Sequence, residues 1–253
     1  MTSSPIFFIA DLHLTPEHPS TVQLFHRFIQ QHAPQAQALY ILGDLFETWV
    51  GDDDLTHPFN QAISASLKSL STQNVEIFFI AGNRDFLIGP RFAQASGLTC
   101  LPDPSIITLF GTPTLLAHGD SFCTDDLAYQ NFRQQVRTAA WQNTFLAQSL
   151  SQRHAIAASI RARSEHAKSA KSMASMDVNH ATIEAALTAA AHHSSSIKRI
   201  IHGHTHQPAR HEYQYADDVV ERWVLPDWYE QAGKCNAGYL ICSEAGCHLA
   251  KLS

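Results

Sequence analysis

The chain has 253 residues, of which 45% are hydrophobic and 16% are charged, and its formal net charge is −6. This length fits one domain, or one domain that carries an insertion. The acidic balance excludes the globally basic surface that is typical of nucleic-acid-binding proteins. No run approaches the length of about 18 apolar residues that a membrane-spanning helix needs.

The N-terminus and the cysteines indicate the compartment. No cationic region followed by an apolar one stands near Met1, so we expect no secretory signal. The five cysteines are odd in number and scattered, which predicts free thiols in a reducing compartment rather than a disulfide framework. We therefore expect a cytoplasmic protein that is attached at most to a membrane surface.

Up to residue 100 the predicted elements alternate between strand and helix. Apolar runs predict strands at 6–10, 39–42 and 75–81, and helical periodicity is found at 20–32, 59–72 and 91–95. This alternation is typical of a layered α/β domain.

The second half of the chain changes character twice. Strands are predicted at 106–110 and 114–117, joined by a Gly-Thr-Pro turn. From Asp125 to about Ala191 no strand pattern appears, and the composition predicts helices at 127–150 and 152–170 and a helix with its exit loop at 184–196. Strands return at 197–201, and the runs 221–229 and 238–242 are expected to close a second sheet.

Five of the predicted strands are followed by residues of the types that bind metals in proteins. The side chains that follow them are Asp11, His13, Asp44, Asn83, His118, His202 and His204. In α/β sheets functional groups collect beyond the carboxyl ends of the strands, so we expect these seven at one edge of a sheet. The spacing of Asp11 and His13, and of His202 and His204, points both members of a pair to one side if the segment is extended.

Asp44 is the residue on which this prediction depends. A single Asp at a strand end is usually a turn residue or a helix cap, but here the pattern of apolar run and metal-binding residue recurs four more times. Seven nitrogen and oxygen donors suffice for two divalent ions if one carboxylate bridges them. The sequence therefore predicts a two-metal site. His206 follows the last pair, and we interpret it as neighbouring structure rather than as a ligand.

The helical stretch between two of these strands is basic. A solvated basic face would be the ordinary interpretation, but the position of the stretch favours a helical cap that binds an anionic, partly apolar ligand. Between residues 133 and 171 it carries one acid, Glu165, against the cations Arg133, Arg137, Arg153, Arg161, Arg163, Lys168 and Lys171. Its apolar residues fit the cap's own core, a ligand's tails or a membrane surface, and the sequence does not separate these; they are Phe132, Trp141, Phe145, Leu146 and Leu150.

Two features beside the predicted metal site have open interpretations. Trp49 fits a position in the core or one outside it equally well. The acidic triplet Asp52-Asp53-Asp54 is more typical of a solvated turn than of a third metal site.

The ordered motifs resemble those of the calcineurin-like metallophosphoesterase superfamily. They are Asp11-x-His13, Gly43-Asp44, Gly82-Asn83, His118-Gly119-Asp120 and His202-Gly203-His204-Thr205-His206. Longer matches from about residue 6 to 210, such as Leu42-Gly43-Asp44-Leu45-Phe46-Glu47 and Gly82-Asn83-Arg84-Asp85-Phe86, resemble a narrower family, the UDP-2,3-diacylglucosamine diphosphatases of lipid A biosynthesis.

The resemblance implies a fold and a division of the chain. The fold would be an α/β metallophosphoesterase sandwich, with two mixed β-sheets flanked by helices and a helical cap insertion. Residues 1–124 and 192–253 would form the core, and residues 125–191 the cap for the lipid substrate. Trp49 would be a wall of the lipid pocket.

The resemblance also implies an activity. The enzyme would hydrolyse the pyrophosphate of UDP-2,3-diacylglucosamine by water attack at the α-phosphorus, giving UMP and 2,3-diacylglucosamine 1-phosphate (lipid X). It would be a monomer that associates peripherally with the cytoplasmic face of the inner membrane and binds no nucleic acid.

Two Mn²⁺ ions are the implied cofactors. Asp11, His13, Asp44 and His204 would hold one ion, and Asp44, Asn83, His118 and His202 the other, with Asp44, Asn83, Arg84 and His118 as the catalytic residues. The implied substrate contacts are Asn83, Arg84, Asp126, Ser164, Lys168, Lys171 and His202. Lys168 stands where some relatives have Asn.

Arg84 departs from the wider superfamily, in which many members carry His at this position. A guanidinium does not release a proton at neutral pH, but it pairs bidentately with phosphate. Arg84 therefore fits charge stabilisation of a diphosphate, whose leaving phosphate needs less protonation than an alkoxide. A surface ion pair with Asp85 is the alternative.

Two other functions are compatible with the sequence. Another phosphoesterase of the same fold would act on phosphoproteins or cyclic nucleotides, and the basic insertion and Arg84 argue against it. A non-catalytic scaffold would be marked by loss of a ligand, and the sequence retains all seven.

Overall fold

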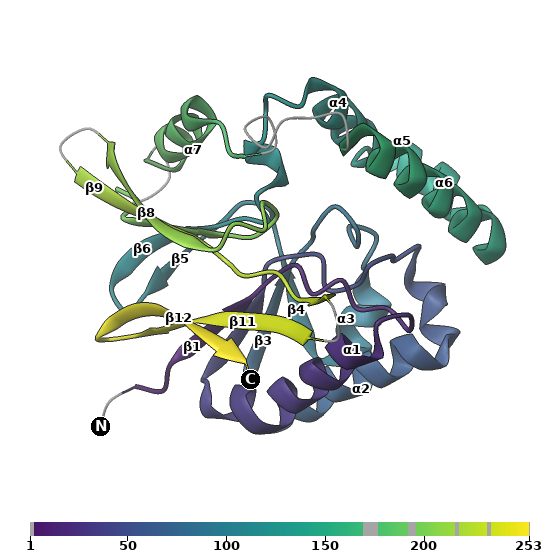
Figure 1. The fold of residues 1–253 in the computed structure, drawn as a ribbon, viewed down its shortest axis with the longest axis horizontal. Helices are drawn as coiled ribbons and strands as arrows, with labels where there is room; N and C mark the ends of the chain where they lie inside the picture. The colour runs from purple at the N-terminus through teal and green to yellow at the C-terminus, as the bar shows by residue number, and fades with distance from the viewer. Residues whose placement is uncertain (1–2, 169–176, 192–195, 216–217, 232–233, 253) are drawn as a thin grey trace.

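Two mixed sheets form the centre of the molecule (Figure 1). The computed structural model describes residues 3–168, 177–191, 196–215, 218–231 and 234–252. The first sheet has the strand order β10-β11-β1-β2-β3-β4, with β12 paired to β11, and the second has the order β5-β6-β7-β9-β8. The strands of the first sheet are β1 (Ile6–Ile9), β2 (Ala38–Ile41), β3 (Glu76–Ile80), β4 (Leu98–Leu101), β10 (Tyr229–Gln231), β11 (Lys234–Ser243) and β12 (Gly246–Leu252). Those of the second are β5 (Ser105–Leu109), β6 (Thr112–Leu116), β7 (Arg199–His202), β8 (Ala209–Tyr215) and β9 (Asp218–Val224).

Helices lie on the outer faces of this pair of sheets and beyond it. Three of them cover the first sheet, and α4 to α6 project past the strand ends (Figure 1). The helices are α1 (Pro19–Arg27), continued by a π-helical turn (Phe28–His32), α2 (Pro58–Ser71), α3 (Pro90–Ser96), α4 (Leu127–Val136), α5 (Ala139–Leu146), α6 (Leu150–Lys168) and α7 (His180–Ala191).

Alternation along β1 shows how the layers are built. Phe7 and Ile9 pack with α1 to α3 in one cluster, whereas Phe8 packs between the two sheets with residues such as Leu116 and Ile201. Successive strand residues point to opposite faces, so a strand between two apolar layers is apolar throughout. The result is a four-layer α/β/β/α sandwich, and the predicted fold class is confirmed.

Helix α7 forms the fourth layer. Its Ile183 and Leu187 share a cluster with Leu115 and Ile200 of the second sheet. It therefore packs as part of the sandwich, although it falls inside the segment 125–191 that was expected to form the cap.

Several predicted elements need correction. The run 238–242 lies in β11, which pairs antiparallel with β1 of the first sheet instead of closing the second. The segment 127–150 forms α4, α5 and the start of α6, because Thr138 accepts a hydrogen bond from the Trp141 N–H and begins a new helix. Strands β4, β8 and β12 were not expected, since their partly exposed residues carry no continuous apolar run.

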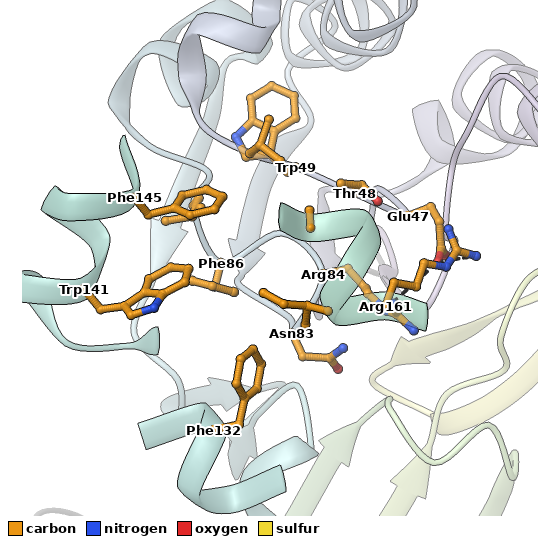
Figure 2. A pocket seen from close by; sticks show the side chains of 14 residues that line it. Glu47, Thr48, Trp49, Asn83, Arg84, Phe86, Phe132, Trp141, Phe145 and Arg161 are labelled. Atoms are coloured by element: carbon orange, nitrogen blue, oxygen red, sulfur yellow. Dashed lines mark ion pairs between the residues drawn. The ribbon is translucent and has the colours of Figure 1, made fainter. Parts of the chain in front are cut away.

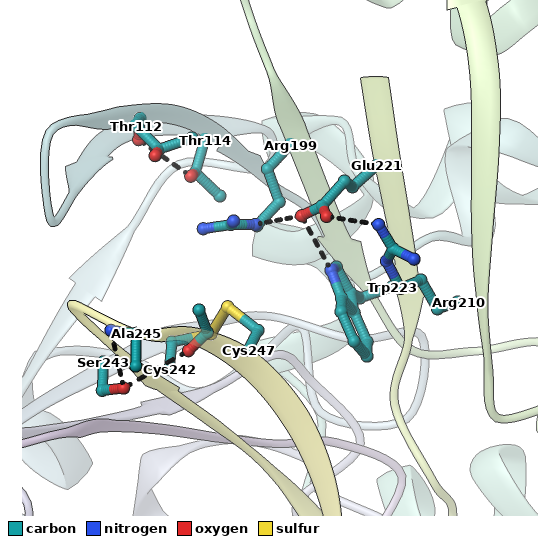
Figure 3. Close-up of a disulfide and its surroundings, with 11 residues drawn as sticks. Thr112, Thr114, Arg199, Arg210, Glu221, Trp223, Cys242, Ser243, Ala245 and Cys247 are labelled. Atoms are coloured by element: carbon teal, nitrogen blue, oxygen red, sulfur yellow. Dashed lines mark hydrogen bonds and ion pairs between the residues drawn. A yellow bond between two sulfur atoms is a disulfide. The ribbon is translucent and has the colours of Figure 1, made fainter. Parts of the chain in front are cut away.

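Two cysteines also differ from the expectation of free thiols. Cys242 and Cys247 form a disulfide, because they face each other in the register of the β11–β12 hairpin (Figure 3). Cys100 and Cys123 are free. The scattered spacing of the five cysteines concealed a pair that a two-residue turn brings together.

The acidic triplet is neither a solvated turn nor a cluster of ligands. Asp52 accepts hydrogen bonds from the backbone N–H groups of Gly89 and Arg91 at the start of α3. Asp53 pairs with Arg153 and Asp54 with His154, both on α6. The triplet therefore joins the core to α3 and α6.

Arg153 fixes α6 to the core, and its loss should destabilise the protein. Its side chain is 2% exposed and also donates to the backbone carbonyl of Val50. We expect Arg153→Ala to lower the free energy of unfolding by about 2–3 kcal/mol, because the buried carbonyl loses its partner. Urea unfolding measures this, with the exposed Arg163→Ala as the control; equal stabilities of the two variants would contradict the role.

Candidate metal centre

The predicted ligands lie at the carboxyl ends of strands from both sheets. Asp11 follows β1, Asp44 follows β2 and Asn83 follows β3, all in the first sheet, whereas His118 follows β6 and His202 ends β7 in the second. The site thus lies where two facing sheets end together. The expectation of a single sheet edge is corrected in this respect.

Left-handed backbone conformations place four of the seven predicted ligands. The φ angles of Asp11, His13, Asp44 and His204 are 53°, 48°, 52° and 68°. Such angles are rare outside glycine and concentrate at functional sites. Asp11 and His13 are therefore not extended, and the argument from alternation is wrong; hydrogen bonds from the N–H groups of both residues to carbonyls of Gly43 and Asp44 hold the turn.

Asp44 lies between two histidines. Its Oδ2 is 3.9 Å from His13 Nε2 and 3.8 Å from His118 Nε2, and its Oδ1 accepts a hydrogen bond of 2.8 Å from the Arg84 N–H. Asn83 Oδ1 lies 3.1 Å from the same His118 nitrogen. Asp11, Asp44 and His118 each offer one atom to a group within 4.8 Å. This central position is the one that a bridging ligand needs.

Two glycines allow the close approach of these side chains. A Cβ on Gly82 would collide with Asp44 Oδ1, and a Cβ on Gly203 would collide with Asp11 Oδ2. The glycines of both motifs are therefore required by the packing around the two carboxylates.

The charge and bonding of the site fit a divalent cation. Asp11 is fully buried, and apart from His206 at 3.6 Å its Oδ1 has no partner among the described residues. Burial lowers the pKa of His118, but Asp44, Asp120 and Asp11 outweigh burial and raise it to about 9. The carboxylates thus favour a positive charge at the site, and a metal ion would satisfy them, Asp11 Oδ1 included.

The last three histidines have different surroundings. Burial lowers the pKa of His204 to about 4 and that of His202 to about 3. Both are therefore neutral, which is the form of imidazole that can bind a metal. His202 Nε2 lies 3.0 Å from Arg222 Nη1, and its Nδ1 lies 2.8 Å from the Gly203 carbonyl oxygen. His206 contacts Asp227 at 3.2 Å and Asp11 at 3.6 Å.

Asp85 clamps the two loops that carry Asp44 and Asn83. It is fully buried, and its carboxylate accepts hydrogen bonds from the N–H groups of Gly82 at 2.9 Å and Leu45 at 2.7 Å. Burial and the neighbouring Asp44 raise its pKa to about 7. The alternative of a surface ion pair between Arg84 and Asp85 is wrong, because Asp85 faces inward.

Helix α4 brings to the site Tyr129, which sequence reasoning missed, and two of the basic residues that it had noted. The Tyr129 hydroxyl donates to Asp120 Oδ2 at 2.7 Å, and its ring lies 6.0 Å from that of His204. Arg133 donates to the same Asp120 oxygen, and Arg137 to the carbonyl of Gly82. No spacing signals these pairs, since their partners lie on different motifs; the excess of basic residues was the only indication.

An apolar pocket opens between the core and α4 to α6 beside this site (Figure 2). Its apolar wall includes Trp49, Phe86, Phe132, Trp141 and Phe145. Asn83, Arg84, Glu47 and Arg161 line its polar end. Trp49 therefore serves both of its proposed roles, because it also packs against Phe46 and Phe92 in the core.

The other predicted substrate contacts lie on the helical segment. Asp126 begins α4 by accepting a hydrogen bond from the Tyr129 N–H. Ser164 lies on α6 one turn after Arg161, and Lys168 is the last residue of that helix. Lys171 falls outside the described residues.

Among the described residues, no helix has both the length and the apolar character that crossing a bilayer requires.

Comparison with known proteins identifies the family. A family model described as calcineurin-like phosphoesterase matches residues 4–208. The chain is 46% identical to the UDP-2,3-diacylglucosamine hydrolase of Aromatoleum aromaticum, over 89% of both chains. It is 47% identical to the protein of that name from Serratia proteamaculans, over 88% of this chain and 90% of the relative. The chain therefore belongs to the calcineurin-like phosphoesterase family and, within it, to the UDP-2,3-diacylglucosamine hydrolases.

Proposed function

We propose that this protein hydrolyses the pyrophosphate bond of UDP-2,3-diacylglucosamine in lipid A biosynthesis. Water attacks the α-phosphorus, and the products are UMP and 2,3-diacylglucosamine 1-phosphate. The observation that carries the proposal is the pocket of Figure 2, in which an aromatic wall suited to acyl chains meets Asn83 and Arg84 at the metal-binding edge.

A divalent metal ion fits the site, and we assign two Mn²⁺ ions to it. One set of ligands is Asp11, His13, Asp44 and His204, and the other is Asp44, Asn83, His118 and His202. A site whose donors are carboxylates, an amide and imidazoles, with no thiolate, is more typical of Mn²⁺ than of structural zinc. Bound ions of this kind activate water and neutralise charge on a phosphoryl oxygen.

The chain's own residues orient the diphosphate. Arg84 stands beside Asn83 at the polar end of the pocket, where its guanidinium can pair with phosphate oxygens. Asp126, Ser164, Lys168, Lys171 and His202 complete the assigned substrate contacts. A carboxylate such as Asp126 suits sugar or ribose hydroxyls, and lysines suit phosphate oxygens.

Helices α4 to α6 form the cap in this proposal, and residues 1–124 and 192–253 form the core. The cap is inserted between β6 and β7, which are adjacent parallel strands of the second sheet. Its apolar face closes the pocket, and α7, which packs on the second sheet, completes the core.

We further assign the protein to the cytoplasmic face of the inner membrane, as a peripheral monomer. Leu127 on α4 and Leu146 on α5 are 72% and 41% exposed, respectively, and would meet a membrane surface from the cap.

Incubation with UDP-2,3-diacylglucosamine tests the activity. We expect UMP release that requires a divalent ion, is abolished by a chelator and is restored by Mn²⁺. A cyclic nucleotide and a phosphopeptide serve as controls and should be poor substrates. Faster turnover of either control than of the lipid nucleotide would refute the proposal.

A further inference from the structure

Glu47 contacts the metal-binding edge and the cap at the same time. It stands three residues after Asp44 and is 8% exposed. Its Oε2 lies 2.8 Å from His13 Nδ1, and its Oε1 lies 2.8 Å from Arg161 Nη2 on α6 and 3.8 Å from Arg84 Nη1. Figure 2 shows Glu47, Arg84 and Arg161 together at one end of the pocket.

One carboxylate oxygen of Glu47 lies beside the His13 ring. Nδ1 faces Glu47, whereas Nε2 faces Asp44 Oδ2 at 3.9 Å. A carboxylate next to one ring nitrogen keeps the proton there, so the lone pair of the other nitrogen is free to bind a metal. The loops of the two residues are joined by a hydrogen bond of 3.1 Å from the Glu47 N–H to the Leu14 carbonyl.

The second oxygen holds two guanidinium groups at the polar end of the pocket. Arg161 comes from the cap, and Arg84 from the loop after β3. Like charges brought this close repel each other, and the carboxylate between them offsets that repulsion. Because Arg161 is still 45% exposed on its side chain, it remains accessible from the pocket.

We propose that Glu47 is a positioning residue that couples the metal ligand His13 to the cap residue Arg161. It orients the His13 ring toward the metal and keeps Arg161 beside Arg84, where the anionic part of the substrate enters. The first half of this inference concerns metal binding alone, and the second half rests on the proposed function.

Replacement of Glu47 by an isosteric amide tests the first half. Glu47→Gln retains one acceptor oxygen, which cannot serve His13 and Arg161 together. We expect Mn²⁺ binding to the metal-free protein to weaken by about tenfold or more, measured from the electron paramagnetic resonance signal of free Mn²⁺. Glu76→Gln removes the same charge from an exposed position at the start of β3 and should bind Mn²⁺ like the wild type.

A second variant keeps the test decisive if Glu47→Gln does not fold. Glu47→Asp keeps the charge but withdraws it from His13 by one methylene group, and it should also bind Mn²⁺ more weakly. Wild-type Mn²⁺ affinity in either folded variant would overturn the proposal. An equal loss of Mn²⁺ affinity in Glu76→Gln would also overturn the proposal.

Kinetics at saturating Mn²⁺ separate the two contacts. Arg161→Ala should raise KM for the lipid nucleotide while leaving Mn²⁺ affinity within about twofold, because only the cap contact is lost. Glu47→Gln should raise KM as well. The double variant should have the same KM as Glu47→Gln, since both substitutions remove the same contact between Glu47 and Arg161. Additive losses would overturn the coupling. If the proposed function fails, no variant hydrolyses the lipid nucleotide, but the Mn²⁺ titrations still decide the role of Glu47.

Discussion

Asp44→Ala is expected to lower metal-dependent turnover by at least about 10³-fold, which corresponds to ~4 kcal/mol of lost barrier reduction. The reason is the central position of the carboxylate, within 4 Å of both His13 and His118. Among the described carboxylates, only Asp44 has an oxygen within 4.0 Å of both histidines, so both proposed ion sites lose a ligand together.

The same variant should keep its fold. The loop after β2 is also held by Asp85, which accepts hydrogen bonds from Leu45 and Gly82. The loss of Asp44 also removes a neighbouring negative charge that raises the pKa of Asp85.

Thermal unfolding with and without Mn²⁺ distinguishes a lost metal site from a lost fold. Binding to the native state alone stabilises a protein in proportion to the logarithm of ligand concentration. The wild type should therefore melt at a higher temperature with Mn²⁺, and Asp44→Ala should show little of this shift. A melting-temperature rise with Mn²⁺ equal to that of the wild type, or full activity, in the variant would contradict the bridging role of Asp44.

The sequence predicted which residues lie together better than it predicted their backbone geometry. Apolar runs that end in Asp11, Asp44, Asn83 and His118 could be recognised because a buried strand and the residue after it are adjacent in the chain. The left-handed φ angles of Asp11 and His13 could not be predicted, since they depend on hydrogen bonds to Gly43 and Asp44, which lie in the loop after the next strand.

Pairs between the sandwich and helices α4 and α6 were the part that sequence reasoning could not assign. Arg153 and Asp53 stand 100 residues apart, and Arg133 and Asp120 come from different elements. The basic composition of the helical segment showed an excess of cations but not their partners. The structure shows that much of this charge pairs with acids of the core, which explains why the solvated-face interpretation does not hold for Arg133 or Arg153.

Strands β4 and β8 were not predicted from the sequence, and their place in the sheets explains why. Strand β4 contributes Thr99 and Cys100, which are exposed, and β8 alternates between exposed and half-buried residues. A strand at a sheet edge buries only part of its surface, so its apolar pattern is weak. The central strands β1, β2 and β3, in contrast, were predicted because they are buried on both faces.

Arg84→Ala is expected to reduce turnover of UDP-2,3-diacylglucosamine by about 10²–10³-fold. The backbone of Arg84 is fixed by its N–H bond of 2.8 Å to Asp44 Oδ1, and its side chain, 16% exposed, lines the pocket beside Asn83. A guanidinium in this place offsets charge on a diphosphate, and its low exposure strengthens the interaction relative to one in water.

The comparison that isolates this role uses two substrates. Hydrolysis of a small aryl phosphate diester depends on the metal-binding edge but not on a second phosphate, so Arg84→Ala should slow it by less than about tenfold. Arg84→Lys keeps the charge without the planar pair of donors and should fall between the alanine variant and the wild type. Arg91→Ala, at an exposed position on α3, is the control for loss of a positive charge. Equal losses on the two substrates would show that Arg84 supports the metal site rather than the diphosphate, because only a contact with the second phosphate separates them.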